Sequence, residues 1–110
     1  QKVMSVRRIK EVVQSSSKTT AVEFSGYNAI ISTVALSDAA EGEFEFTINN
    51  DKIQTTSTIM LTPIYAGTTG YPVVIVKSQT KGSCVVKVKN VHATTALNAL
   101  MKIQFGLVHN

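Results

Sequence analysis

The chain of 110 residues has no Trp, one Cys and two His. A single cysteine, Cys84, cannot form an internal disulfide, and it leaves a cysteine-rich zinc site without ligands. Disulfide scaffolds and zinc fingers are therefore excluded. No apolar run approaches the roughly 20 residues that a membrane-spanning helix needs, so we expect no membrane insertion.

Candidate catalytic residues are also scarce. Neither His92 nor His109 stands beside a Ser or Cys in a nucleophile motif. Glu43 and Glu45 share one face of a predicted strand, as a glycosidase pair or a calcium site would, but no second carboxylate group complements them. A solvated strand face explains them better. We therefore expect no enzymatic activity, no cofactor and no metal.

The residues that are abundant favour β-structure. The chain has 14 Val and 9 Ile against 5 Leu, together with 13 Thr and 10 Ser. β-branched side chains suit a pleated sheet better than a helix. With 44% hydrophobic residues, the chain has enough apolar side chains for one folded domain. Seven or eight alternating segments predict an all-β fold, an antiparallel and jelly-roll-like β-sandwich, over residues 20–110.

The strand pattern also predicts which side chains face the core. The alternation of polar and apolar residues over residues 43–48, 83–89 and 100–109 has the period of two that a half-buried strand requires. It places inward the side chains of Phe44, Phe46, Cys84, Val86, Val88, Met101, Ile103, Phe105 and Leu107. Pro63 lacks a backbone donor, so the strand over 56–65 should lie at a sheet edge or end near Pro63. Four consecutive apolar residues within 72–77 predict a strand covered on both faces.

The N-terminal segment, residues 1–19, is predicted to be an arm or an edge strand followed by a Ser/Thr-rich loop. Its apolar residues also fit a helical spacing, but Val and Ile favour the extended alternatives. As an arm, it would add to a neighbour's sheet edge or to another protein surface. The candidate residues for docking a partner are Val3, Val6, Arg7, Arg8 and Ile9.

The C-terminal half is basic, since residues 51–110 contain six Lys and one acidic residue. Nucleic-acid binding needs cations interleaved with stacking aromatics, and Phe44, Phe46 and Phe105 are assigned to the core. We therefore read the lysines as a solvated face and expect no nucleic acid. Tyr65 and Tyr71 flank a Gly/Thr loop. These tyrosines, with Thr68 and Thr69, form either a candidate rim for a receptor or glycan or ordinary packing at the sheet end.

A family resemblance rests on the order of several short motifs. The stretch 42–50, GEFEFTINN, followed by Ile53 and by TSTI at 56–59, resembles the pattern "F-T-hydrophobic-T-N-S, then A-T-S-V" of small β-domains in tailed-bacteriophage virion proteins. The resemblance covers roughly residues 42–108 and continues through PVV at 72–74, GSCVV at 82–86, Asn90, ALN at 96–98 and KIQF at 102–105. Cys84 stands where an aromatic is usual, and Asn50 stands where Ser is usual.

The resemblance implies a non-enzymatic virion protein. Domains of this kind decorate capsids or form the heads of head or tail fibres, and they are often trimeric. We therefore expect a capsid decoration (cement) protein on the particle surface that forms a homo-oligomer, which the resemblance implies is a trimer, and that binds the major capsid protein or other virion proteins. The alternative is a fibre-tip domain that binds a host surface receptor or glycan. A stand-alone carbohydrate-binding module is disfavoured by the lack of Trp, and a hydrolase comes last.

Overall fold

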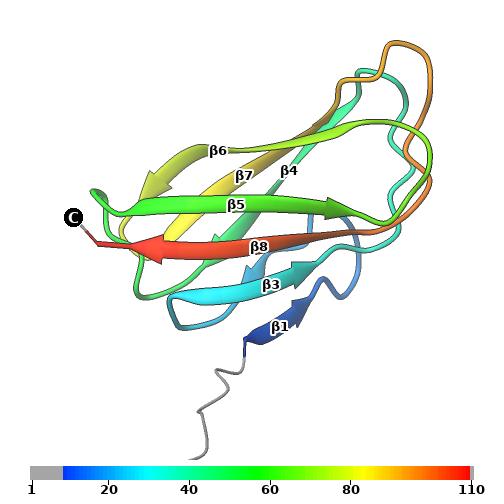
Figure 1. Cartoon of the computed structure of the whole chain (residues 1–110). Coiled ribbons are helices and arrows are strands. Elements are labelled where there is room, and N and C mark those ends of the chain that lie inside the picture. The colour runs from blue at the N-terminus through cyan, green and yellow to red at the C-terminus, as the bar shows by residue number, and fades with distance from the viewer. Residues whose placement is uncertain (1–8, 110) are drawn as a thin grey trace, which may run out of the picture.

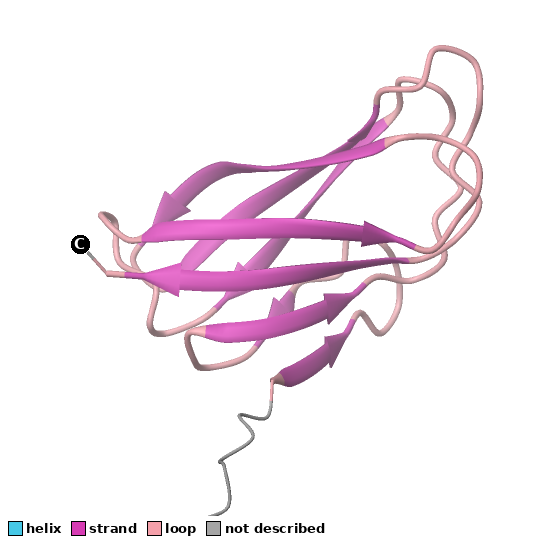
Figure 2. Cartoon of the chain, in the orientation of Figure 1, coloured by secondary structure: helices cyan, strands magenta, loops and turns pink. Residues whose placement is uncertain are grey.

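The computed structural model of the protein describes residues 9–109, which form eight strands and no helix (Figure 2). No helix that could span a membrane is found among these residues. The strands are β1 (Lys10–Val13), β2 (Val22–Glu23), β3 (Asn28–Ser32), β4 (Glu43–Asn49), β5 (Thr58–Tyr65), β6 (Pro72–Thr80), β7 (Ser83–Asn90) and β8 (Met101–Val108).

The strands form two packed sheets of four. The front sheet has the order β1-β3-β8-β5 and faces the viewer in Figure 1, and the back sheet has the order β2-β4-β7-β6. The chain changes sheet at every connection except the β6–β7 hairpin, whose turn contains Gly82 at a positive φ of 88°. The predicted all-β sandwich is confirmed.

The sheets are mixed, whereas the sequence predicts an antiparallel sandwich. β1 runs parallel to β3, and β2 runs parallel to β4, while the other four pairs of neighbouring strands are antiparallel. The cause is the alternation of the chain between the sheets. Because β2 lies in the other sheet, β1 and β3 run in the same direction and become neighbours in the front sheet.

One core fills the space between the sheets. Phe44 and Phe46 on β4 and Ile103 and Phe105 on β8 are all buried in the same cluster, as predicted. Phe105 meets Phe24 edge to face, with ring centroids 5.1 Å apart, an arrangement that aromatic pairs prefer. The inward side chains of β7 are buried as well, which confirms the alternation read from the sequence. The C-terminal strand β8 lies between β3 and β5, so this end of the chain is locked into the front sheet.

Two predictions about edge strands have opposite outcomes. β5 is an edge strand of the front sheet, as Pro63 requires. β6, however, is an edge strand of the back sheet, and Val73 and Ile75 point outward with 44% and 50% of their surface exposed. The prediction of a strand covered on both faces is therefore wrong. A run of apolar residues fits a buried strand and also an edge strand with an apolar outer face.

The N-terminal segment is an edge strand where the structure describes it. Residues Lys10–Val13 form β1, which pairs with Ala29–Ser32 of β3 in the chain's own front sheet. For these four residues the structure thus has the edge strand and not the free arm. Four of the candidate docking residues, Val3, Val6, Arg7 and Arg8, lie outside the described residues.

Candidate binding surfaces

One end of the sandwich gathers three long loops, residues 33–42, 66–71 and 91–100, and we call it the long-loop end (Figure 1). Asn90, the last residue of β7, is 1% exposed and holds these loops together. Its Nδ2 donates to the carbonyls of Asp38, Ala39 and Thr95 at 2.9–3.3 Å. Its Oδ1 accepts the backbone N–H groups of Tyr71 and His92 at 3.0 and 3.1 Å. One buried amide therefore joins all three loops.

A second asparagine fixes the Gly/Thr loop. The Oδ1 of Asn98 accepts the backbone N–H of Thr68 at 3.0 Å, and its Nδ2 donates to the Thr68 hydroxyl at 3.1 Å. The Tyr65 hydroxyl donates to the carbonyl of Thr69 at 2.7 Å and accepts the backbone N–H of Asn98 at 2.6 Å. The Thr69 hydroxyl donates to the carbonyl of Ala96. Three of the four rim candidates, Tyr65, Thr68 and Thr69, therefore make structural bonds within this end.

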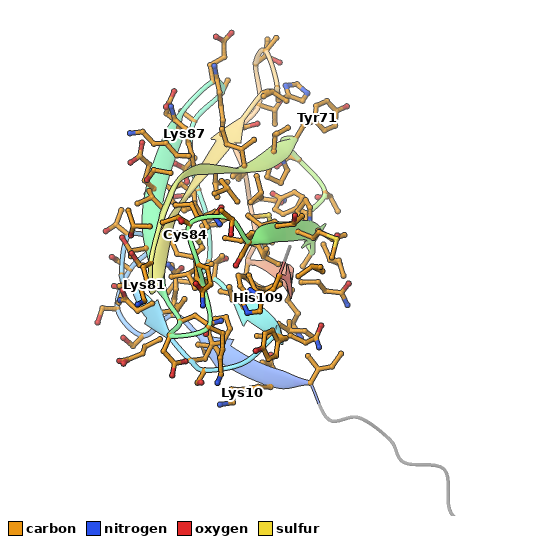
Figure 3. All side chains as sticks on the ribbon, turned by 90° about the vertical axis from the view of Figure 1, so that its left-hand side faces the viewer. Lys10, Tyr71, Lys81, Cys84, Lys87 and His109 are labelled. Carbon is orange, nitrogen blue, oxygen red and sulfur yellow. The ribbon has the colours of Figure 1, made fainter. Side chains whose placement is uncertain are left out.

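The fourth rim candidate, Tyr71, is available for contact. It is 63% exposed and projects from the upper end of the molecule in Figure 3. Its ring packs against that of His92, with centroids 4.7 Å apart and planes tilted by 39°. The Nδ1 of His92 accepts the backbone N–H groups of Thr94 and Thr95, both at 3.0 Å, which fixes the ring. The aromatic surface at the long-loop end is thus the pair of Tyr71 and His92.

Charge gathers on the outer face of the back sheet, which we call the charged face. Residues that pair across neighbouring strands share a face of the sheet. The outward positions of β2, β4, β6 and β7 therefore place six charged residues there: Glu23, Glu43, Glu45, Lys77, Lys87 and Lys89. Glu45 bonds Lys77 at 2.8 Å and Glu43 bonds Lys87 at 2.6 Å. The bond to Lys87 lowers the pKa of Glu43 and raises that of Lys87. These carboxylates are thus paired with lysines on a solvated face.

The outer face of the front sheet, which we call the apolar face, differs from the charged face. Its outward positions contain two charged residues, Glu11 and Lys102, which pair with each other at 3.5 Å. The exposed aliphatic side chains around them are Ile9, Val13, Met60, Ile64 and Val108. The remaining outward positions are Asn28, Ile30, Ser32, Thr58, Thr62, Gln104 and Gly106.

A hollow of about 240 Å³ opens in the apolar face. Gly106 is one of the residues that line it, and a Cβ at this position would come within 3.3 Å of the Met60 methyl group. Ile9, Ile30 and Met60 line its sides. Ile9 is the one candidate docking residue that the structure describes, and it is 45% exposed in this hollow.

Cys84 lies in the core and is not positioned for chemistry. It is 1% exposed, and burial raises the pKa of its thiol to about 11. A thiol held neutral in this way is a poor nucleophile and a poor metal ligand. Within residues 9–109, no three His, Cys, Asp or Glu side chains lie close enough together to hold a metal ion.

Sequence reasoning missed two features of these surfaces. The sequence does not show that neighbouring strands bring the exposed side chains of Ile30, Met60 and Ile64 onto one face. Asn90 is the last residue of an alternating strand, a position at which asparagine often bonds nearby backbone, and this signal could have found it. We find no match to the chain among protein-family models, curated proteins or solved structures.

Proposed function

We propose that this domain is a non-enzymatic structural protein of a tailed-bacteriophage virion, and that it decorates the capsid surface. The motifs at residues 42–108 that resemble virion β-domains are the starting point. In the sandwich these motifs coincide with strands and a turn, namely β4, the start of β6, the β6–β7 turn, β7 and β8.

One observation carries the proposal: two asparagines of the resembling pattern, Asn90 and Asn98, hold the loops of the long-loop end in place. Asn90 joins three loops through five hydrogen bonds, and Asn98 fixes the Gly/Thr loop. Hydrogen bonds of this kind make the loops, and with them the whole domain, rigid. Rigidity suits a protein that is bound repeatedly to a particle and acts by occupying a surface.

The charges and the thiol fit the same function. The carboxylates Glu43 and Glu45 each bond a lysine, and Cys84 is held as a neutral thiol in the core. These groups support the fold and the solubility of the sandwich. The partners in this proposal are the major capsid protein or other virion proteins and further copies of the chain.

A second candidate function, a fibre tip that binds a host receptor or glycan, is favoured by one feature. Tyr71 is exposed at a loop end and is packed against a fixed His92, as an aromatic contact for a sugar ring would be. This candidate needs the domain at the tip of a fibre, with its long-loop end pointing outward.

Immunogold electron microscopy tests both candidates. An antibody raised against the purified chain is applied to particles from the host that carries the gene. Label distributed over the capsid supports decoration, and label confined to fibre tips supports the second candidate. Particles that contain the expected capsid and tail proteins but bind no label would contradict both.

A further inference from the structure

The two outer faces of the sandwich differ in charge, although both are built from strands of one small domain. The charged face contains six charged side chains and the apolar face contains two. If both faces were simply solvated, both would be expected to carry charges, because isolated sheets use charged outward residues to stay soluble. The apolar face has few such charges, so little on it opposes association with another surface.

Apolar side chains lie on all four strands of this face and gather around the hollow, while Thr62 separates Met60 from Ile64 along β5. Met60 lies beside Gly106, and Ile64 lies beside Lys102, on the adjoining strands β5 and β8. Ile30 on β3 and Ile9 before β1 continue the surface to the other edge, around the hollow at Gly106. Exposed apolar residues that gather in one place mark interaction sites more often than scattered single residues do.

The chemistry of the face limits its occupant. Its charges are one acid and one base that already neutralise each other, so it offers no net charge to attract an acidic or basic partner. The residues assigned to its outward positions include no Phe, Tyr or Trp, so it lacks the platform on which a sugar or a nucleobase would stack. A neutral surface with exposed aliphatic side chains fits another surface of the same kind.

We infer that the apolar face docks against the same face of a second copy of this chain, so that two front sheets pack together. A neutral face can meet its own copy without repulsion, whereas the protein as a whole has a net charge of +4. Each copy also presents a hollow and exposed aliphatic side chains, of which Ile64 and Met60 are 53% and 52% exposed. A contact of one patch with itself closes as a two-fold pair.

The size of the face allows a weak pair. Its strands β1, β3, β8 and β5 have four, five, eight and eight residues, which at about 4.8 Å between strands gives a flat area of about 400 Å² on each copy, or about 800 Å² for the two. That total is below the roughly 1,000 Å² of stable specific interfaces, so we expect a pair that forms at high protein concentration and dissociates on dilution. This inference does not rest on the proposed function. A three-fold assembly, which the resemblance implies, would require an additional interface.

Two matched substitutions test the inference. Ile64 on β5 and Ile75 on β6 are both outward-facing isoleucines on edge strands, with 53% and 50% of their surface exposed. Ile64→Lys places a charge on the apolar face. Because a two-fold contact contains this face from both copies, the interface would then contain two such charges. We expect sedimentation velocity of the full chain to show a monomer–dimer equilibrium in which Ile64→Lys weakens association at least about tenfold, equivalent to 1.4 kcal/mol. Ile75→Lys, on the charged face, should leave association unchanged.

Several outcomes overturn the inference. The intact chain could remain a monomer from dilute to concentrated solution, or the two substitutions could affect association equally. An assembly of any size that persists unchanged in Ile64→Lys also overturns it. Circular dichroism of both variants controls for folding, and since both positions are exposed, both variants should melt close to the parent protein. If Ile64→Lys fails to fold, Met60→Lys repeats the test on the same strand and face.

Discussion

Asn90 is a single side chain on which much of the loop structure depends. It is 1% exposed, and each polar atom of its amide bonds backbone from the surrounding loops. We predict that Asn90→Ala destabilises the domain by about 2–4 kcal/mol, because it leaves several buried carbonyl and N–H groups without partners. Urea unfolding measures this loss.

Asn49→Ala is the matched control for this prediction. Asn49 also ends a strand, β4, but its side chain is exposed, so the substitution should change the free energy of unfolding by less than about 0.5 kcal/mol. Equal effects of the two substitutions would contradict the role of the Asn90 amide in holding the three loops together.

Cys84 gives a prediction for the pH dependence of stability. Burial raises the pKa of its thiol to about 11, whereas an exposed thiol ionises near pH 8.5. Between these values the unfolded chain binds fewer protons than the folded one, so the free energy of unfolding should fall as pH rises. The Cys84→Ala variant has no thiol at this position, so its stability lacks this pH dependence. The parent should therefore lose up to about 1.4 kcal/mol more per pH unit than the variant across this window.

The comparison of parent and variant cancels the ionisation of lysines, which both contain. Parallel stability curves for the two proteins would mean that the thiol is not desolvated in the folded state. Rapid labelling of the native protein by a thiol reagent would contradict the buried position independently, since labelling should be fast only after denaturation.

At the scale of the elements, β4 shows how completely an alternating strand separates two environments. Phe46 is 2% exposed and lies in the core, while its neighbours Glu45 and Thr47 point outward. We predict that Phe46→Ala costs about 3–5 kcal/mol, because the cavity it leaves cannot collapse fully. Thr47→Ala on the same strand should cost far less. A loss below about 1 kcal/mol for Phe46→Ala in denaturant unfolding would place this side chain outside the core.

The same alternation explains which elements could be predicted from the sequence. β4, β7 and β8 have one buried face and one exposed face, so their period of two is visible and their inward residues are correct. The outer face of β6 includes the apolar residues Val73 and Ile75, so the sequence of β6 looks like that of a strand buried on both faces. Pro63 gave the right position for β5 because its missing donor is a property of one residue and needs no pattern.

The surfaces were less predictable than the strands because they depend on pairing between distant segments. Tyr71 and His92 meet through the β6–β7 ladder and the loop that Asn90 fixes, and no spacing in the sequence encodes that contact. Tyr65 was grouped with Tyr71 because the two flank one loop. The structure separates them, since the Tyr65 hydroxyl bonds backbone within the long-loop end.

At the scale of the whole molecule, the two outer faces of the sandwich differ: the charged face is suited to solvent, and the apolar face is the one that we infer to dock. The two faces contain matched lysines. Lys102 on the apolar face is 48% exposed and bonds Glu11, while Lys77 on the charged face is 52% exposed and bonds Glu45. Each lysine therefore reports the accessibility of its own face in one and the same molecule.

Acylation of the native protein by an amine-reactive ester, read by peptide mass spectrometry, measures both lysines at once. We predict that the ratio of Lys102 to Lys77 modification falls as the protein is concentrated, because docking covers Lys102 and leaves Lys77 in solvent. The denatured chain gives the intrinsic ratio as a control. A ratio that stays constant from dilute to concentrated protein, or a loss of reactivity at Lys77 instead, would contradict docking through the apolar face.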